Sequence, residues 1–473
     1  MSCLSTPLRF LPVVPQELRL ASSLLSGQSF RWHRSSPVHA TRPETGTAPS
    51  DVDGEEWSFA WGDRTVVLRQ DDHGVHYRSL YPFAPPHAAY LQDVANDTTR
   101  PLLVDYFQLA TPLAPLYSQW RSADDKFAKK LDADERRDSR LRGIRVLKQD
   151  EWETLVSFIC SANNNIARIT LMVNRVCAQL GNRLPHPSHF DPDHVYEREC
   201  DFVSAKLPPP TPPPNDLALY SFPTPESLAD IAPTEALLRR LGFGYRANYI
   251  PTSARHLVET CRDQKTTPIE YLKSLRRDAP RAKGGTEQTD DERLKLVREK
   301  LLEFKGVGRK VADCVMLFGL GWSQVVPVDT HVFQIAVRDY GFPGSKTASL
   351  TPALHDKVSE HLAKKWQPHA GWCQQVLFFA DLKSNSSTTL ATPTKTEVTF
   401  TKIEFDADLD DDEVDAEIAT ARQKKKTFED DVREIMENPG RKRRRTTVVK
   451  SEKVECKREF GDAKVVVKGE GAV

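Results

Sequence analysis

One lysine lies beside a glycine-rich turn, in a pattern that can support covalent chemistry. Lys310 follows the sequence Lys-Gly-Val-Gly-Arg at 305–309, between two segments with helical spacing of apolar residues, 293–304 and 311–318. The pattern predicts two helices joined by a tight turn, in which glycine lets the backbone approach a ligand and helix N-terminal amides can hold a phosphate. Alone, a G-x-G turn is more often an ordinary interhelical connection.

The surroundings of Lys310 make a chemical role worth considering. Its positive charge falls in the first turn of the predicted helix, where it opposes the helix dipole. An amine held there can form a Schiff base with a carbonyl-level carbon; the alternative is a simple phosphate contact. Further on, Asp329 follows Val326-Pro327-Val328 and precedes a predicted helix at 332–339. Its carboxylate can cap that helix and also stabilise charge next to the amine.

The predicted secondary structure that positions these residues changes along the chain from strands to helices. Three segments near the N-terminus, 57–61, 65–70 and 75–78, alternate apolar and polar residues around a glycine-containing turn at 71–74, as antiparallel strands do. After about residue 101 the apolar spacing becomes helical, first on a face of Trp152, Leu155, Val156 and Ile159, then on a face of Ile166, Ile169, Val173, Val176, Cys177 and Leu180. The sequence predicts an α+β protein, with an antiparallel β-sheet domain (1–100) packed on an all-helical body (101–382) that contains a helix-hairpin-helix motif.

Two insertions and a tail interrupt or follow this body. The proline-rich stretch 207–215, within an insertion near 197–219, and the polar stretch 281–291 are predicted to be loops. From about residue 383 the chain carries too little apolar surface to offset the entropy of ordering, so 383–473 is predicted to be a disordered charged tail. Its basic runs at 424–426 and 441–445 are typical of a nuclear import signal or a nucleic-acid contact, although a merely solvated charge run is the alternative.

Composition narrows the class of protein. The 473 residues carry 66 basic and 66 acidic side chains, so the formal net charge of zero neither indicates nor excludes a polyanionic partner. The eight cysteines include no C-x-x-C pair, which argues against a zinc ribbon or an iron–sulfur loop and favours reduced thiols. The absence of a long apolar run or a secretory signal pattern leads us to expect an intracellular, soluble protein with no membrane partner.

Six separated segments together resemble the eukaryotic 8-oxoguanine DNA glycosylase/AP lyase family, within the helix-hairpin-helix DNA glycosylase superfamily. They occur in the family's order between about Leu18 and Leu382, and six separated matches are far more specific than one. The segments are SGQSFRW at 26–32, CSANNNIARI at 160–169, LGFGYRA at 241–247, GVGRKVADC at 306–314, VPVDTH at 326–331 and AGWCQQVLF at 370–378.

The resemblance implies roles for residues at the damaged nucleotide. Lys310 would attack C1′ as the Schiff-base nucleophile, and Asp329 would stabilise positive charge on the sugar. The backbone carbonyl of Gly27 would accept the hydrogen on N7 that distinguishes 8-oxoguanine from guanine. Gln374 would read the Watson–Crick edge of the extruded base, and Phe378 and Cys314 would lie on its two faces. Pro327 would also line the damaged-base pocket. Without the resemblance, Phe378 and Cys314 would be taken for plain core residues.

The resemblance also implies contacts to the rest of the duplex. Asn163 would fill the vacated stack and hold the orphaned cytosine with Arg168 and Arg246, while Tyr245 would wedge the duplex. Phosphate contacts would come from Gly306, Gly308 and His331. The alternative for Asn163 is a turn or cap, and for His331 a helix cap. The family usually has proline before G-V-G, whereas this chain has Lys305, which adds a candidate phosphate contact.

These residues predict a bifunctional repair enzyme. It would excise 8-oxoguanine paired with cytosine from double-stranded DNA and cleave the abasic site by β-elimination. No metal or organic cofactor is needed for that chemistry, although hairpin carbonyls could hold a structural cation. We expect a monomer in the nucleus, with the mitochondrion as a second compartment. The rival hypotheses are a related glycosylase with another base specificity and a non-catalytic helix-hairpin-helix DNA-binding protein.

Overall fold

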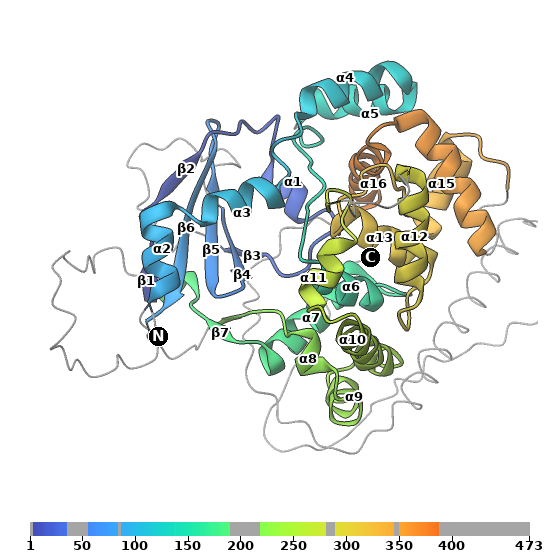
Figure 1. Cartoon of the computed structure of the whole chain (residues 1–473). Helices are drawn as coiled ribbons and strands as arrows, with labels where there is room; N and C mark the ends of the chain where they lie inside the picture. Colours follow the sequence, from blue (N-terminus) through green and yellow to red (C-terminus); the bar gives the residue numbers. More distant parts are fainter. Residues whose placement is uncertain are drawn as a thin grey trace, which may run out of the picture. The chain divides into compact units, whose positions relative to one another are not determined.

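The computed structural model describes residues 3–35, 55–83, 87–137, 139–189, 218–280, 289–344 and 350–386 (Figure 1). The proline-rich insertion, most of the insertion predicted at 281–291 and the tail from residue 387 lie outside these ranges, so the loop and tail predictions stay predictions there. Within these ranges, no helix has both the length and the apolar character needed to cross a membrane.

The N-terminal part contains one antiparallel six-stranded sheet. Its order is β1-β6-β5-β4-β3, with β2 also pairing with β6. The predicted hairpins are confirmed, and the carboxylate of Asp71 closes the turn between β5 and β6 by accepting the backbone N–H groups of His73 and Gly74. The strands are β1 (Cys3–Ser5), β2 (Arg9–Leu11), β3 (His33–Ser35), β4 (Glu56–Trp61), β5 (Arg64–Gln70) and β6 (Val75–Pro82).

The N-terminal part also contains the short helices α1 (Leu20–Leu24), α2 (Ala88–Asn96) and α3 (Thr99–Tyr106). Residues of α1 and α3 share the core of the sheet. Leu103 and Tyr106 of α3 and the following Phe107 pack in one cluster with Trp57 and Leu68 of the sheet. Both α2 and α3 begin before residue 101, so helical structure starts earlier than the apolar spacing indicates, and the domain boundary near residue 100 stays a prediction.

The remaining described residues are mostly helical (Figure 1). A two-stranded sheet of β7 (Arg183–Leu184) and β8 (Leu219–Tyr220) and a 3-10 turn, η1 (Pro187–His189), interrupt the helices. The helices are α4 (Leu113–Ala123), α5 (Asp125–Glu135), α6 (Glu151–Cys160), α7 (Ile166–Leu180), α8 (Pro225–Leu228), α9 (Ile231–Arg240), α10 (Arg246–Asp263), α11 (Pro268–Ser274), α12 (Asp290–Leu302), α13 (Arg309–Phe318), α14 (Thr330–Asp339), α15 (Pro352–Trp366) and α16 (Ala370–Ser386).

Helices α6 and α13 form the centre of this body. Every residue of α6 is buried, and so is every residue of α13 after its first two. The predicted apolar face of α7 is confirmed at its middle, but Ile166 is 38% exposed and Leu180 is only partly buried. Ile166 begins α7 and lies near Gly27 instead of entering the core.

The predicted helix-hairpin-helix is present as α12 and α13. The prediction that residues 281–291 form a loop is wrong at its end, because α12 begins at Asp290. Thr289 and Glu292 form a reciprocal capping box there, which satisfies backbone N–H groups of the first turn. At the other end of the body, α16 continues to Ser386, beyond the predicted boundary at 382.

A buried ion pair joins the sheet to the helical body. Arg31 donates to both carboxylate oxygens of Glu153 on α6, at 2.8 and 2.6 Å. The same guanidinium donates to the carbonyls of Ala60 on β4 and Tyr220 on β8. A buried guanidinium is tolerated only when its N–H groups have acceptors, as they do here. Arg31 therefore links α6, β4 and β8 from its position just after the loop that carries Gly27.

Candidate active site

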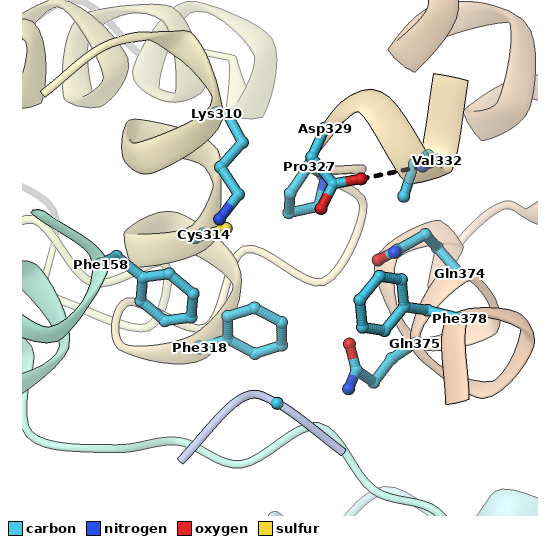
Figure 2. Close-up of a pocket in the computed structure, with 11 residues that line it drawn as sticks. Phe158, Lys310, Cys314, Phe318, Pro327, Asp329, Val332, Gln374, Gln375 and Phe378 are labelled. Atoms are coloured by element: carbon cyan, nitrogen blue, oxygen red, sulfur yellow. Dashed lines mark hydrogen bonds between the residues drawn. The ribbon is translucent and has the colours of Figure 1, made fainter. Parts of the chain in front are cut away.

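One pocket is lined by residues of α6, of the hairpin, of α14 and the segment before it, of α16 and of the loop after α1. Figure 2 shows Lys310 and Cys314 on one wall, Pro327 and Asp329 on the next, and Gln374 and Phe378 opposite them. The full lining is Gly27, Phe158, Lys310, Cys314, Phe318, Pro327, Asp329, Val332, Gln374, Gln375 and Phe378. The structure therefore brings together all the residues that the sequence predicts at the damaged nucleotide.

Lys310 is half-buried and points into this pocket from the first turn of α13. Its Nζ donates to Ser161 Oγ at 3.0 Å and lies 5.1 Å from the centroid of the Phe158 ring. Ser161 Oγ donates its own hydrogen to the Phe158 carbonyl at 2.7 Å. The hydroxyl can therefore only accept from Lys310, which leaves the lone pair of an unprotonated amine free to attack an electrophile.

Asp329 is the N-cap of α14. One carboxylate oxygen accepts the backbone N–H of Val332 at 2.8 Å, which is the capping role predicted from the sequence. Pro327 and Val328 precede it and are buried, so the carboxylate leaves a fixed segment of backbone. Lys310 and Asp329 face the same cavity (Figure 2). The capping role and a second role in the cavity are compatible, because a carboxylate has two oxygens.

Cys314 and Gln374 offer different chemistry to a ligand. Burial raises the pKa of the Cys314 thiol to about 12, so the thiol stays neutral and forms an apolar wall of the pocket. Gln374 is 6% exposed, and among the described residues its Oε1 has no hydrogen-bond partner. A buried acceptor without a partner is costly, so this oxygen is placed for a donor that a ligand would supply.

Gly27 allows a backbone conformation and a close approach that a side chain would block. Its φ of +77° lies in the left-handed region. A Cβ there would lie 2.9 Å from Cδ1 of Ile166 and 3.8 Å from Cε1 of Phe378. Gln375 Nε2 donates to the carbonyl of the preceding Ser26 at 2.8 Å, which ties this loop to α16. The sequence does not indicate these contacts of the Gly27 loop with Ile166 and Gln375.

Residues predicted at the orphaned base gather at the turn between α6 and α7. Asn163 is exposed with a φ of +48°, and the Tyr245 hydroxyl donates to the carbonyl of Ala162 at 3.0 Å. Arg246 is only 3% exposed and donates to the carbonyls of Ala162 and Asn163. Arg168 is exposed on α7, beyond the turn. Arg246 therefore holds the backbone of Asn163, a contact that sequence alone does not indicate.

The predicted phosphate contacts have different surroundings. Gly306 has a φ of +81°, and a Cβ there would lie 2.5 Å from the ring of Tyr249 on α10, so this glycine lets the hairpin pack against α10. Gly308 caps α13 without any side-chain acceptor, and no atom lies within 4 Å of where its Cβ would be. His331 Nε2 lies 2.9 Å from a carboxylate oxygen of Asp381. The cap of α14 comes from Asp329, while the phosphate contact of His331 stays a prediction.

Five residues at the pocket were not assigned a role from the sequence. Phe158 and Phe318 are stacked with ring centroids 5.4 Å apart, and they follow the apolar spacing of core residues. Ser161 and Gln375 lie inside the six matching segments, which is the signal that would have found them. Val332 completes the wall beside Asp329. Among the described residues, no group of three His, Cys, Asp or Glu side chains is arranged to hold a metal ion.

Comparison with protein families shows the family to which this fold belongs. Residues 156–368 match the HhH-GPD superfamily of base excision DNA repair proteins. Residues 10–155 match the N-terminal domain of 8-oxoguanine DNA glycosylase. The chain therefore belongs to the 8-oxoguanine DNA glycosylase family, and it is an enzyme with N-glycosylase and DNA lyase activities in 8-oxoguanine repair.

Individual relatives agree with this assignment. The N-glycosylase/DNA lyase of Saccharomyces cerevisiae is 36% identical over 397 residues, which cover 80% of this chain and 87% of the yeast protein. The N-glycosylase/DNA lyase OGG1 of Arabidopsis thaliana is 31% identical and covers 78% of this chain and 79% of its own length. The apo form of Clostridium acetobutylicum 8-oxoguanine glycosylase/lyase has the same fold, with a TM-score of 0.51, 22% identity, and coverage of 80% of this chain and 99% of the bacterial one.

Proposed function

We propose that this enzyme excises 8-oxoguanine paired with cytosine and then cleaves the abasic site through an imine on Lys310. The observation that carries the proposal is the pocket itself, where Lys310, Asp329 and the unpartnered Gln374 Oε1 face one cavity. A half-buried amine, a carboxylate and an unsatisfied acceptor are what glycosidic-bond cleavage at a flipped purine requires. We also propose that the enzyme acts as a monomer; sedimentation of the DNA complex would test this.

In the proposed reaction the amine of Lys310 attacks C1′ and the bond from C1′ to the base nitrogen breaks, so the base leaves with that electron pair. The carboxylate of Asp329 stabilises the positive charge on the sugar during this step. The aminal then loses a proton and its sugar ring opens to give the imine. Removal of a C2′ proton expels the 3′ phosphate by β-elimination, and water releases Lys310.

Selection of the oxidised base is proposed to rest on Gly27 and Gln374. The carbonyl of Gly27 would accept the N7 hydrogen that guanine lacks, and Gln374 would pair with the Watson–Crick edge. The loop of Gly27 is held by Gln375 and packed by Ile166, so its carbonyl can be fixed before the base enters. Preorganisation of this kind lowers the cost of recognition.

The test is incubation with duplexes that carry 8-oxoguanine opposite each of the four bases, with borohydride present. We expect cleavage to be fastest opposite cytosine and a covalent adduct to be trapped. Lesion binding without cleavage would favour a non-catalytic helix-hairpin-helix protein. Cleavage of another damaged base, with 8-oxoguanine left intact, would favour a glycosylase of different specificity.

Arg246→Ala tests how the opposite base is read. Since Arg246 holds the carbonyls of the turn that presents Asn163, its loss should slow excision opposite cytosine much more than opposite adenine. A lost charge-assisted hydrogen bond costs about 1–3 kcal/mol, which is roughly tenfold to a hundredfold in preference. Single-turnover rates opposite all four bases measure this. A common decrease for every partner would mean that Arg246 supports the fold and not the choice of cytosine.

We also propose that the enzyme enters the nucleus, directed by the basic runs at 424–426 and 441–445, with the mitochondrion as a second destination. Both runs lie outside the described residues. Because every pocket residue precedes residue 387, truncation after Ser386 should preserve excision on short duplexes while moving a fluorescent fusion out of the nucleus. Unchanged nuclear accumulation of the truncated enzyme would contradict this role of the basic runs.

A further inference from the structure

Helix α15 contacts the segment that carries Asp329 at two points. Ser359 Oγ donates to the carbonyl of Val326 at 2.9 Å. His355 Nε2 accepts the backbone N–H of Val328 at 3.2 Å. Residues four apart lie on one face of a helix, so these two side chains hold the backbone just before Asp329 from the same side. Neither side chain lines the pocket.

Carboxylates surround the imidazole of His355, which is 2% exposed. Its Nε2 lies 3.6 Å from Oδ2 of Asp313 on α13, and its Nδ1 lies 3.6 Å from Oδ1 of Asp356 on α15. Each carboxylate also has an arginine. Arg298 on α12 donates to Oδ1 of Asp313 at 2.8 Å, and Arg309 lies 3.0 Å from Oδ2 of Asp356. The charged groups facing His355 therefore come from α12, α13 and α15.

The contact to Val328 fixes the protonation state of His355. An imidazole nitrogen that accepts an N–H group carries no hydrogen, so Nε2 is bare and the single proton resides on Nδ1, toward Asp356. This is the neutral ring. Burial lowers the pKa of His355, which keeps the ring neutral at neutral pH despite the nearby carboxylates.

A second arrangement is available when the ring becomes protonated. A hydrogen on Nε2 would face the hydrogen of Val328 N–H, so that contact could not persist. Among the described residues, Asp313 Oδ2 has no hydrogen-bond partner and lies on the same side of the ring. The new N–H can therefore turn to Asp313, which leaves the N–H of Val328 buried without an acceptor.

We propose that His355 is a positioning residue for Asp329, which it holds through Val328, and that protonation of His355 releases this hold and slows excision. The proposal rests on the catalytic role of Asp329 in the proposed function. Val328 is directly bonded to Asp329, and a buried N–H that loses its acceptor forces the backbone to move. The displacement would change the position of the carboxylate relative to Lys310, while Gly27, Gln374 and Phe378 lie on other segments of the pocket.

Two substitutions of His355 separate the hydrogen bond from the packing. In His355→Gln the amide oxygen reaches about as far as Nε2 and can accept Val328 N–H, but it does not titrate. In His355→Leu the volume is kept and the acceptor is lost. His361→Gln is the matched control, because His361 lies on the same helix and contacts the carbonyl of Tyr340 instead.

The experiment measures single-turnover excision and duplex affinity of the full chain at about pH 7.5 and about pH 4.5, the second well below the ordinary histidine pKa because the pKa of His355 is lowered. At the higher pH we expect His355→Leu to slow excision roughly tenfold with little change in affinity, and His355→Gln to match the wild type. The hydrogen bond from Val328 N–H to His355 is fully formed above the ordinary histidine pKa, and it is lost as the pH falls through the lowered pKa of His355. On acidification the wild type and His361→Gln should therefore slow down more than His355→Gln.

Two outcomes would overturn the proposal. Equal rates for His355→Leu and His355→Gln at both pH values would mean that only packing matters. An acid decrease in His355→Gln identical to that of the wild type would place the titrating group elsewhere. Failure of the proposed function itself would appear differently, as a wild-type enzyme that neither excises 8-oxoguanine nor forms a trapped adduct.

Discussion

Lys310→Gln should abolish strand cleavage and borohydride trapping while leaving binding to a lesion duplex nearly unchanged. The glutamine amide keeps a similar length but has no nucleophilic lone pair, so the imine cannot form. Loss of a covalent nucleophile lowers turnover by on the order of 10⁴-fold or more. Affinity should change little, because the pocket walls that contact the base are intact. Single-turnover cleavage, adduct trapping and equilibrium binding on one duplex measure the three effects.

The hairpin supplies a matched control for this variant. Lys305 lies five residues earlier, is exposed, and has its ammonium 5.9 Å from the centroid of the Tyr249 ring, outside the pocket. Lys305→Gln removes the same charge, so it should at most weaken binding by loss of a phosphate contact and should still be trapped. A covalent adduct that persists in Lys310→Gln would assign the nucleophile to another amine.

The sequence predicts the helices, Lys310 and Asp329 because their signals are local. In α13, the glycine turn, the apolar spacing and the position of Lys310 within the first turn all follow from consecutive residues. Asp329 as a cap follows from the proline-containing segment before it and the apolar spacing after it. Their convergence on one cavity came from the family resemblance, since no local rule brings 27, 310 and 374 together.

Contacts between residues far apart in the sequence could not be predicted from it. Gly306 is needed because Tyr249 on α10 occupies the space of its side chain, and Ile166 leaves its predicted core face to cover Gly27. Arg246 is almost fully buried beneath the turn of Asn163, although arginine is mostly exposed in proteins. Each case depends on which segment lies opposite, and periodicity within one helix does not contain that information.

Asp329→Asn should lower the rate of base excision by about two orders of magnitude or more, with little change in affinity or stability. The asparagine side chain has an oxygen that can accept Val332 N–H, and asparagine and aspartate are comparable N-caps, so α14 should begin at the same residue. What disappears is the negative charge. In the proposed reaction that charge would stabilise the transition state, where the sugar becomes positive, more than the bound substrate. Single-turnover excision, duplex affinity and thermal unfolding are the measurements.

The two roles of Asp329 can be separated because a second aspartate has only one of them. Asp150 caps α6 by accepting the backbone N–H of Glu153 at 2.8 Å, and it does not line the pocket. Asp150→Asn should therefore match the wild type in excision, binding and unfolding. Asp329→Ala should add to the catalytic loss a loss of stability of about 1 kcal/mol from the missing cap. If Asp329→Asn behaved like Asp150→Asn, or lost affinity and rate in equal measure, the carboxylate would be a structural cap and the charge on the sugar would be stabilised by another group.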